Sequence, residues 1–221
     1  MHAIRFPALL GAIALLGLAA PLAAQTTYRV TGTVSVVGSN LGTSVAFGDS
    51  FQMDMVFDET QSPWSSSGTL ALYKLQFSTL VIESTGAGTL TWSREDPAGD
   101  NINHGFSVEN SASRDALTLN GYFTGPALNG KAVSGYVFTF IDTTKAAFAG
   151  TAIPFDLTTG TFNSQLLDLR FDGFVPGQDI INFTATSFQV NPSAVPEPST
   201  YATLAGLAML GFVVITRRRR S

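Results

Sequence analysis

His104 is the one histidine outside the first 24 residues, so it is the first residue to consider for catalytic chemistry. A Ser-His-Asp triad needs such an imidazole, but the chain has no G-x-S-x-G turn to present the serine. Zinc sites normally use several histidine or cysteine ligands, and the chain has no cysteine. We therefore expect His104 to have a structural role, and we predict no metal site and no cofactor.

Carboxylates offer a second kind of chemistry, because glycosidases need only two of them on opposite sides of a cleft. Glu83, Glu109 and Asp168 lie on or beside predicted strands, but nothing in their spacing favours catalysis. The sequence therefore predicts that the protein is not an enzyme. A hydrolase that modifies polysaccharides is the less favoured alternative.

Two acidic loops are candidates for calcium, which takes six to eight oxygen ligands. One runs from Glu95 to Asn101, and the other contains Asp168, Asp172 and Asp179. Neither has the spacing of an EF-hand. Acidic turns are more often simply solvated, so we assign no metal ligand and leave calcium binding open.

The central part of the chain is acidic. Between Gln25 and Val195 there are seven basic and fifteen acidic residues, an excess of eight negative charges. Such a surface repels phosphate backbones, which argues against nucleic-acid binding. The missing cysteines also exclude disulfide bonds.

Alternating apolar and polar residues predict strands along most of this central part. The clearest example is 51–57, where Gln52 and Asp54 point away from the apolar face. Many short strands separated by Gly, Asn, Asp and Pro turns predict an all-β fold, namely an antiparallel β-sandwich resembling a jelly roll. A single sheet closed on itself is the alternative. Similar patterns mark further strands at 28–36, 70–82 (one bent strand or two), 89–92, 106–108, 116–119, 133–141 and 180–190.

Two Asn-Gly pairs predict tight hairpin turns, because a type I′ turn needs positive φ at both central residues. Asn120-Gly121 and Asn129-Gly130 together predict a three-stranded meander over 115–141. The stretch 142–168 is the hardest to interpret. Within it, 145–149 is expected to be either a helical turn or another strand.

The N-terminus has the features of a secretory signal peptide. Arg5 precedes an apolar run over 6–20, which is followed by Pro21 and small residues up to Ala24. The apolar run is shorter than a membrane-spanning helix. We expect signal peptidase to cut after Ala24 and the mature protein to begin at Gln25.

The C-terminus combines four features in a fixed order. Val195, Pro196, Glu197 and Pro198 come first, followed by two polar residues, an apolar stretch over 201–216 and then Arg217, Arg218, Arg219 and Arg220. Sixteen helical residues span about 24 Å. Tyr201 and the arginines can anchor such a short helix at the two membrane interfaces, with the arginines on the cytoplasmic side.

This tail resembles the PEP-CTERM sorting signal. The resemblance implies that the protein is exported, held transiently in the inner membrane, and processed near Pro196–Pro198 by the protease-transpeptidase exosortase. It also implies association with exopolysaccharide and biofilm, at the cell surface or outside the cell. We therefore predict a non-catalytic surface or extracellular-matrix protein, with a carbohydrate-binding module as the alternative.

In a polysaccharide context, aromatic residues in loops are candidates for binding, because sugar rings stack on flat aromatic faces. Trp64 is flanked only by polar and turn residues and is the best single candidate for a carbohydrate contact. Tyr122 is a weaker one, and Trp92 has the pattern of a core residue. A partly buried loop anchor is the alternative role for Trp64.

The chain is thus expected to have four parts. These are a signal peptide (1–24), an exported β-sandwich domain (25–190), a linker with the Pro-Glu-Pro motif (191–200), and a transmembrane helix with its basic tail (201–221).

Overall fold

The computed structural model describes residues 25–95, 104–173 and 175–192. Residues Gln25–Ser193 form one compact unit. The described elements are β1 (Gln25–Val37), η1 (Ser39–Leu41), β2 (Ser50–Asp58), β3 (Ser65–Ser66), β4 (Leu70–Lys74), β5 (Phe77–Ser84), β6 (Gly88–Glu95), β7 (Gly105–Asn110), β8 (Asp115–Gly121), β9 (Val133–Asp142), η2 (Thr159–Thr161), β10 (Ser164–Phe171) and β11 (Ile180–Pro192).

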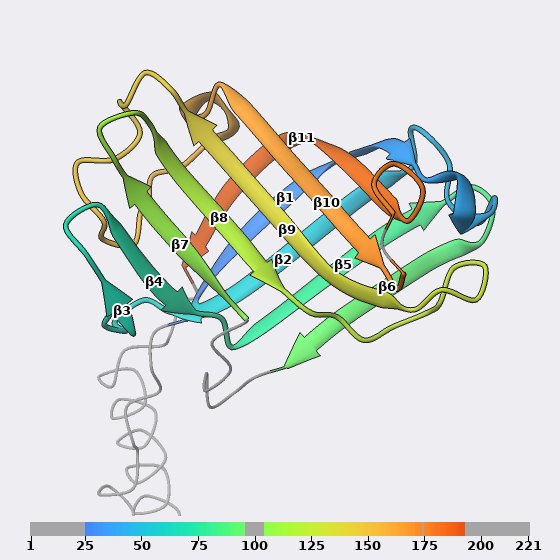
Figure 1. The fold of residues 1–221 in the computed structure, drawn as a ribbon. Helices are drawn as coiled ribbons and strands as arrows, with labels where there is room; N and C mark the ends of the chain where they lie inside the picture. Colours follow the sequence, from blue (N-terminus) through green and yellow to red (C-terminus); the bar gives the residue numbers. More distant parts are fainter. Residues whose placement is uncertain (1–24, 96–103, 174, 193–221) are drawn as a thin grey trace, which may run out of the picture. The chain divides into compact units, whose positions relative to one another are not determined.

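All eleven strands belong to one antiparallel sheet, in the order β3-β4-β7-β8-β9-β10-β11-β1-β2-β5-β6. The sheet curls, so that β7 to β10 cross in front of β1, β2, β5 and β6 (Figure 1). The predicted all-β class is therefore confirmed. The two separate sheets expected of a sandwich are instead the two halves of one continuous sheet.

The sheet stays continuous because β10 and β11 still pair where it turns. Their pairing is short, running from Leu167–Phe183 to Arg170–Ile180. The far edge of the sheet is also partly covered, since Ser93 of β6 exchanges two backbone hydrogen bonds of 2.9 Å with Thr124. Such pairing of an edge strand limits its exposure to other chains.

The alternation of apolar and polar residues along each strand determines which side chains face the core. In β2, Phe51, Met53, Met55 and Phe57 are buried, while the residues between them are half-buried on the other face. Successive residues of a strand point to opposite faces, so this pattern places the apolar face inside the curl.

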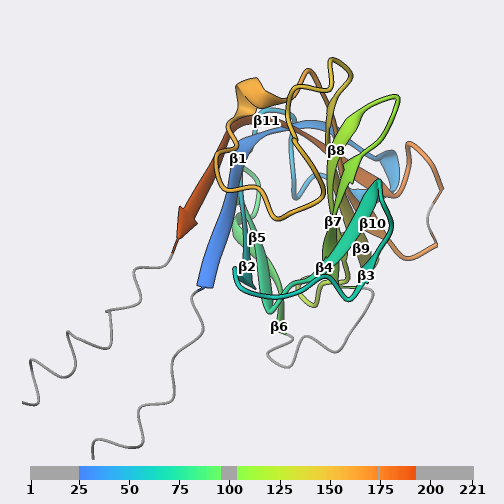
Figure 2. The ribbon, with the colours of Figure 1, turned by 90° about the vertical axis from the view of Figure 1, so that its left-hand side faces the viewer.

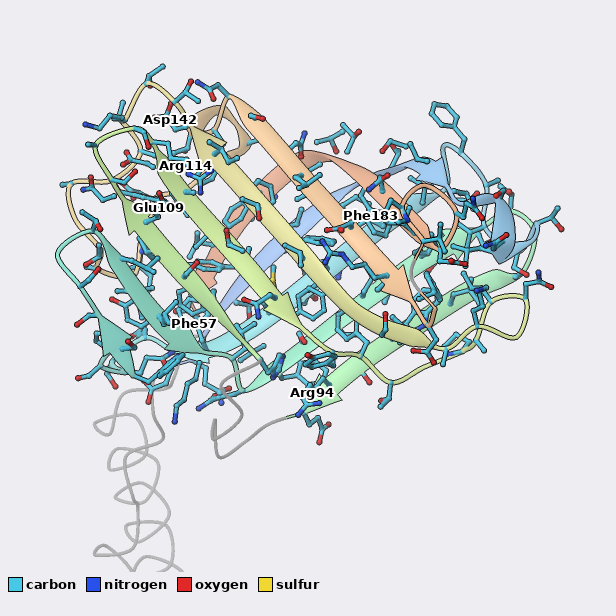
Figure 3. The ribbon with its side chains drawn as sticks, in the orientation of Figure 1. Phe57, Arg94, Glu109, Arg114, Asp142 and Phe183 are labelled. Atoms are coloured by element: carbon cyan, nitrogen blue, oxygen red, sulfur yellow. The ribbon has the colours of Figure 1, made fainter. Side chains whose placement is uncertain are left out.

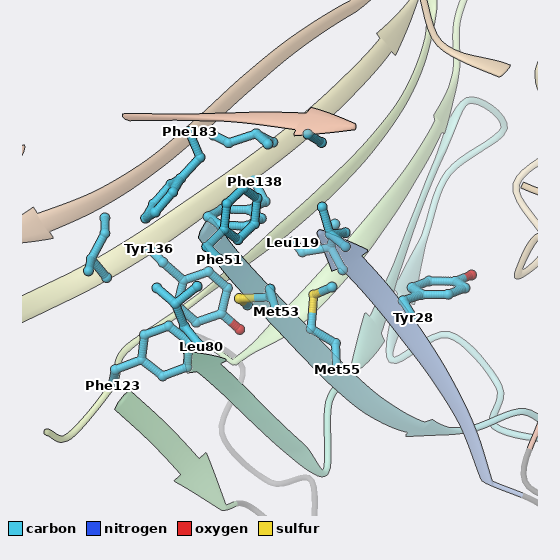
Figure 4. Packing of buried hydrophobic residues seen from close by; sticks show 14 of the residues in the cluster. Tyr28, Phe51, Met53, Met55, Leu80, Leu119, Phe123, Tyr136, Phe138 and Phe183 are labelled. Carbon is cyan, nitrogen blue, oxygen red and sulfur yellow. The ribbon is translucent and has the colours of Figure 1, made fainter. Parts of the chain in front are cut away.

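Aromatic rings join the two halves of the sheet across the core (Figure 4). Tyr28 of β1 meets Phe106 of β7 edge to face, with ring centroids 5.7 Å apart. Phe51 of β2 meets Phe138 of β9 in the same way at 6.0 Å. Edge-to-face pairs add to the free energy gained from burial.

The two Asn-Gly pairs have different outcomes. Asn129 and Gly130 have φ values of 48° and 78°, and Leu128 and Lys131 exchange backbone hydrogen bonds around them. This turn is confirmed. Asn120 and Gly121, in contrast, are the last two residues of β8 and pair with β9, so the prediction of a turn there and of a three-stranded meander is wrong.

Packing explains the glycine in β8. A Cβ atom at Gly121 would lie 2.8 Å from His104 Cδ2 and 2.9 Å from Tyr136 Cε1. Atoms cannot approach so closely without displacement. Gly121 is therefore required by the core and not by a turn.

The stretch 143–163 is a long loop between β9 and β10, followed by the unpredicted strand β10. Within it, 145–149 forms bends without regular structure, so neither the helical turn nor the strand expected there is found. The loop crosses between the two halves of the sheet at one end of the body (Figure 2). We call it the 143–163 loop.

Two tyrosines from the core hold this loop. The Tyr28 hydroxyl donates to Pro154 O at 2.7 Å, and the Tyr73 hydroxyl donates to Thr151 O at 2.8 Å. Leu157 of the loop is buried in the core. The 143–163 loop therefore closes one end of the core.

The predicted signal peptide (1–24), and the linker and tail beyond residue 192, lie outside the described residues. Within the part of the chain that the structure describes, no helix is long and apolar enough to cross a membrane.

Candidate functional site

The structure places His104 beside a serine. Ser78 Oγ of β5 lies 2.8 Å from His104 Nε2, and the Tyr136 hydroxyl donates to Ser78 Oγ at 3.3 Å. All three side chains are buried. Desolvation also raises the pKa of Tyr136, so its hydroxyl stays protonated. A substrate has no access to this serine, and the cluster connects strands of the two sheet halves.

The three carboxylates considered for catalysis each contact a different neighbouring residue. Glu83 accepts from Thr89 Oγ1 at 2.7 Å, and Asp168 pairs with Arg170 at 2.7 Å. Glu109 pairs with Arg114 at 2.9 Å, where β7 ends and β8 begins (Figure 3). The Arg114 hydrogen bond lowers the pKa of Glu109. The three lie on β5, β7 and β10, which are not neighbouring strands of the sheet.

The second acidic loop is organised around a lysine. Lys131 Nζ lies 2.9 Å from Asp179 Oδ1, which also accepts from Asn40 Nδ2 at 3.0 Å. The Val175 N–H donates to Asp179 Oδ2 at 3.0 Å. These donors, Lys131 above all, lower the pKa of Asp179. The carboxylate thus joins three loops at one end of the body.

The first acidic loop lies outside the described residues except for Glu95. Over 25–95, 104–173 and 175–192, no group of three or more His, Cys, Asp or Glu residues is arranged to hold a metal ion.

Asp142 organises the start of the 143–163 loop. Its carboxylate accepts from the Thr144 N–H and hydroxyl at 2.8 and 2.6 Å, and from the Ala146 and Ala147 N–H groups at 2.8 and 3.1 Å. The Thr144 hydroxyl is the largest of the effects that lower the pKa of Asp142. Next to it, Asp115 Oδ2 accepts from the Phe148 N–H at 3.0 Å.

Trp64 lies just before the short edge strand β3, with 42% of its surface exposed. The backbone N–H of Trp64 donates to Leu72 O at 3.0 Å, which ties this segment to β4. All residues of 62–70 are exposed. Trp64 is therefore a solvent-accessible ring on a hairpin that is fixed to the sheet.

A second exposed ring, Tyr122, lies beside a depression on the outer face of β8, β9 and β10. The depression is also lined by Asn120, Gly135 and Arg170. The sequence drew attention to Tyr122 but not to its neighbours. Gly135 and Arg170 lie beside this depression because they are cross-strand partners, and no local sequence pattern shows such pairing. The outward-facing positions of adjacent strands are the signal that could have suggested these neighbours.

The described body is thus an all-β domain whose last strand ends at Pro192, directly before the predicted sorting tail. Residues 194–220 match the family model of the PEP-CTERM protein-sorting motif. The resemblance found in the sequence is therefore confirmed, and the chain is consistent with a PEP-CTERM sorting domain-containing protein. No curated protein and no solved structure matches the chain.

The matched segment contains Val195, Pro196, Glu197 and Pro198, together with Tyr201 and the four terminal arginines. These residues lie outside the described part of the chain, so their predicted roles stay predictions. The motif itself supports export and sorting to the cell surface, with exosortase as the processing partner.

Proposed function

We propose that this protein is a non-catalytic component of the cell surface or extracellular matrix, associated with exopolysaccharide in a biofilm. The observation that carries the proposal is the PEP-CTERM motif at 194–220. Signal peptidase removes residues 1–24, and the helix over 201–216 holds the chain in the inner membrane until exosortase acts near Pro196–Pro198.

The body supports a structural role in two ways. Its serine–histidine pair is buried, and its candidate carboxylates are hydrogen-bonded to separate neighbours. Its core is a continuous cluster of apolar side chains drawn from both halves of the sheet. Such a domain is suited to persist outside the cell without a cofactor.

The sorting step is tested by changing its two parts separately. Replacing Pro196, Glu197 and Pro198 with alanine should leave an uncleaved, membrane-bound precursor, because the apolar helix and arginines remain. Deleting Arg217 to Arg220 should instead weaken retention in the membrane, since the charges oppose complete translocation. Cell fractionation and mass measurement distinguish the two outcomes. Normal processing of the triple-alanine variant would rule out motif-directed sorting.

A second candidate function is carbohydrate recognition by the body, which the exposure of Trp64 favours. It is tested by measuring whether the exported protein binds its producer's polysaccharide and loses binding on Trp64→Ala. An enzymatic role is tested in the same samples, where a hydrolase would release reducing sugar ends and a binding protein would not.

A further inference from the structure

The depression beside Tyr122 has a flat apolar side. Tyr122 follows the last residue of β8 and is 49% exposed. Its ring lies over Gly135 of β9, since a Cβ atom at Gly135 would be 3.7 and 3.9 Å from Tyr122 Cδ1 and Cε1. Because Gly135 has no side chain, no side chain of β9 occupies the space beside the Tyr122 ring at this position. Val137, two residues further on, continues the lining.

Polar side chains also line the depression. Arg170 is the cross-strand partner of Gly135, and Asn120 is the partner of Val137. These side chains lie on the outer face because the residues between them, such as Leu119, Tyr136 and Leu169, are buried. The Arg170 guanidinium from β10, the Asn120 amide from β8 and Ser134 therefore line the depression together with the Tyr122 ring.

Arg170 is held by a buried carboxylate. Its Nε donates to Asp168 Oδ2 at 2.7 Å, and Asp168 is only 2% exposed although it belongs to the outer face of β10. The ion pair fixes the guanidinium at the depression and neutralises its charge. Asp168 is thus a positioning residue for Arg170.

We propose that this depression is a subsite for one sugar unit of an uncharged polysaccharide. A pyranose ring has an apolar C–H face, which fits the Tyr122 ring, and hydroxyl groups at its edge, which fit Asn120 and Arg170. Uncharged sugars are favoured because Arg170 is already neutralised and the body has an excess of eight negative charges. The proposal rests on the polysaccharide association proposed above, and it assigns the contact to Tyr122 instead of Trp64.

The test uses the exported chain, residues 25–221, kept in mild detergent. Native gel electrophoresis with embedded polysaccharide reports binding as retardation, and the probes are dextran, galactomannan and xylan, with alginate as an acidic probe. We expect retardation by at least one uncharged probe and none by alginate. Tyr122→Ala should weaken binding about tenfold or more, while Tyr122→Phe keeps the ring and stays within about twofold of the parent.

Phe155→Ala is the matched control, because Phe155 is an exposed ring of similar accessibility in the 143–163 loop. It should bind like the parent chain. Loss of binding with Trp64→Ala but not with Tyr122→Ala would overturn this subsite and leave carbohydrate recognition at Trp64. Absence of retardation by every uncharged probe would also overturn it, whereas the sorting proposal is decided by the processing experiment alone.

Discussion

Ser78 Oγ lies 2.8 Å from Nε2 of His104, with both side chains buried in the interior of the curled sheet. In hydrolases a contact of this kind activates the serine, but there the serine faces a cleft. Here the Tyr136 hydroxyl also donates to Ser78. The contact therefore belongs to a buried network that joins β5, β9 and the residue directly before β7. Buried polar groups of this kind contribute to stability when they are hydrogen-bonded to one another.

We predict that Ser78→Ala lowers the free energy of unfolding by about 1–3 kcal/mol, because His104 and Tyr136 each lose a hydrogen bond in a buried site. Urea unfolding followed by the fluorescence of the buried Trp92 measures this. A fluorophosphonate reagent should not label Ser78 in the folded parent protein. Labelling that disappears in Ser78→Ala would mean that the serine is accessible and that the structural role is wrong.

The 143–163 loop depends on two tyrosine hydroxyls, so we predict that Tyr28→Phe and Tyr73→Phe each destabilise it by about 0.5–1.5 kcal/mol. The rings stay in the core, so the effect should be confined to the loop. Hydrogen exchange followed by mass spectrometry should show faster exchange in peptides from 143–163, most of all in the double variant. Tyr122→Phe, which changes an exposed hydroxyl, serves as the control. Unchanged exchange in the double variant would contradict the prediction.

The strands were predictable because burial on one face leaves a period of two in the sequence. For β2, the alternation over 51–57 predicted which side chains face the core, and the structure confirms it. The turn at Asn129-Gly130 was predictable for a similar local reason, since both residues need positive φ.

Features that depend on distant segments were not predictable in this way. Gly121 looked like a turn residue because its true constraint, the closeness of His104 and Tyr136, comes from other strands. The continuity of the sheet depends on the short pairing of β10 with β11, and β10 itself carries outward apolar and acidic residues that obscure its alternation. The depression beside Tyr122 likewise needs the register of three strands.

Asp142 contributes to the protein's response to acid, as do Glu109 and Asp179, whose pKa values are also lowered. The pKa of Asp142 is lowered in the folded state, above all by the Thr144 hydroxyl, so its contribution to stability is present above the pKa of the unfolded chain and is lost as the pH falls through the folded value. An unfolded aspartate titrates near about 3.9. We therefore predict that the free energy of unfolding is nearly constant from about pH 7 to 5 and falls below about pH 4.

The variant Asp142→Asn isolates this contribution. It should lower the free energy of unfolding at neutral pH, because hydrogen bonds to a charged acceptor are lost, and its stability should fall less steeply in acid. Asp156→Asn, which changes an exposed carboxylate on the same loop, is the control. Parallel pH profiles for Asp142→Asn and the parent protein would show that Asp142 does not carry the response.

The last prediction concerns Gly121, where the sequence suggested a turn and the structure shows a packing constraint. Gly121→Ala should lower the free energy of unfolding by about 1–3 kcal/mol, since the added methyl group would approach His104 Cδ2 to 2.8 Å and Tyr136 Cε1 to 2.9 Å. Gly150→Ala adds the same group where no atom lies within 4 Å, and its effect should stay within about 0.5 kcal/mol. The effects of both substitutions are measured from the midpoints of urea unfolding curves, compared between curves with the same dependence of the unfolding free energy on urea concentration. Equal midpoints for the two variants would mean that β8 tolerates a side chain here and that the glycine is not required by the core.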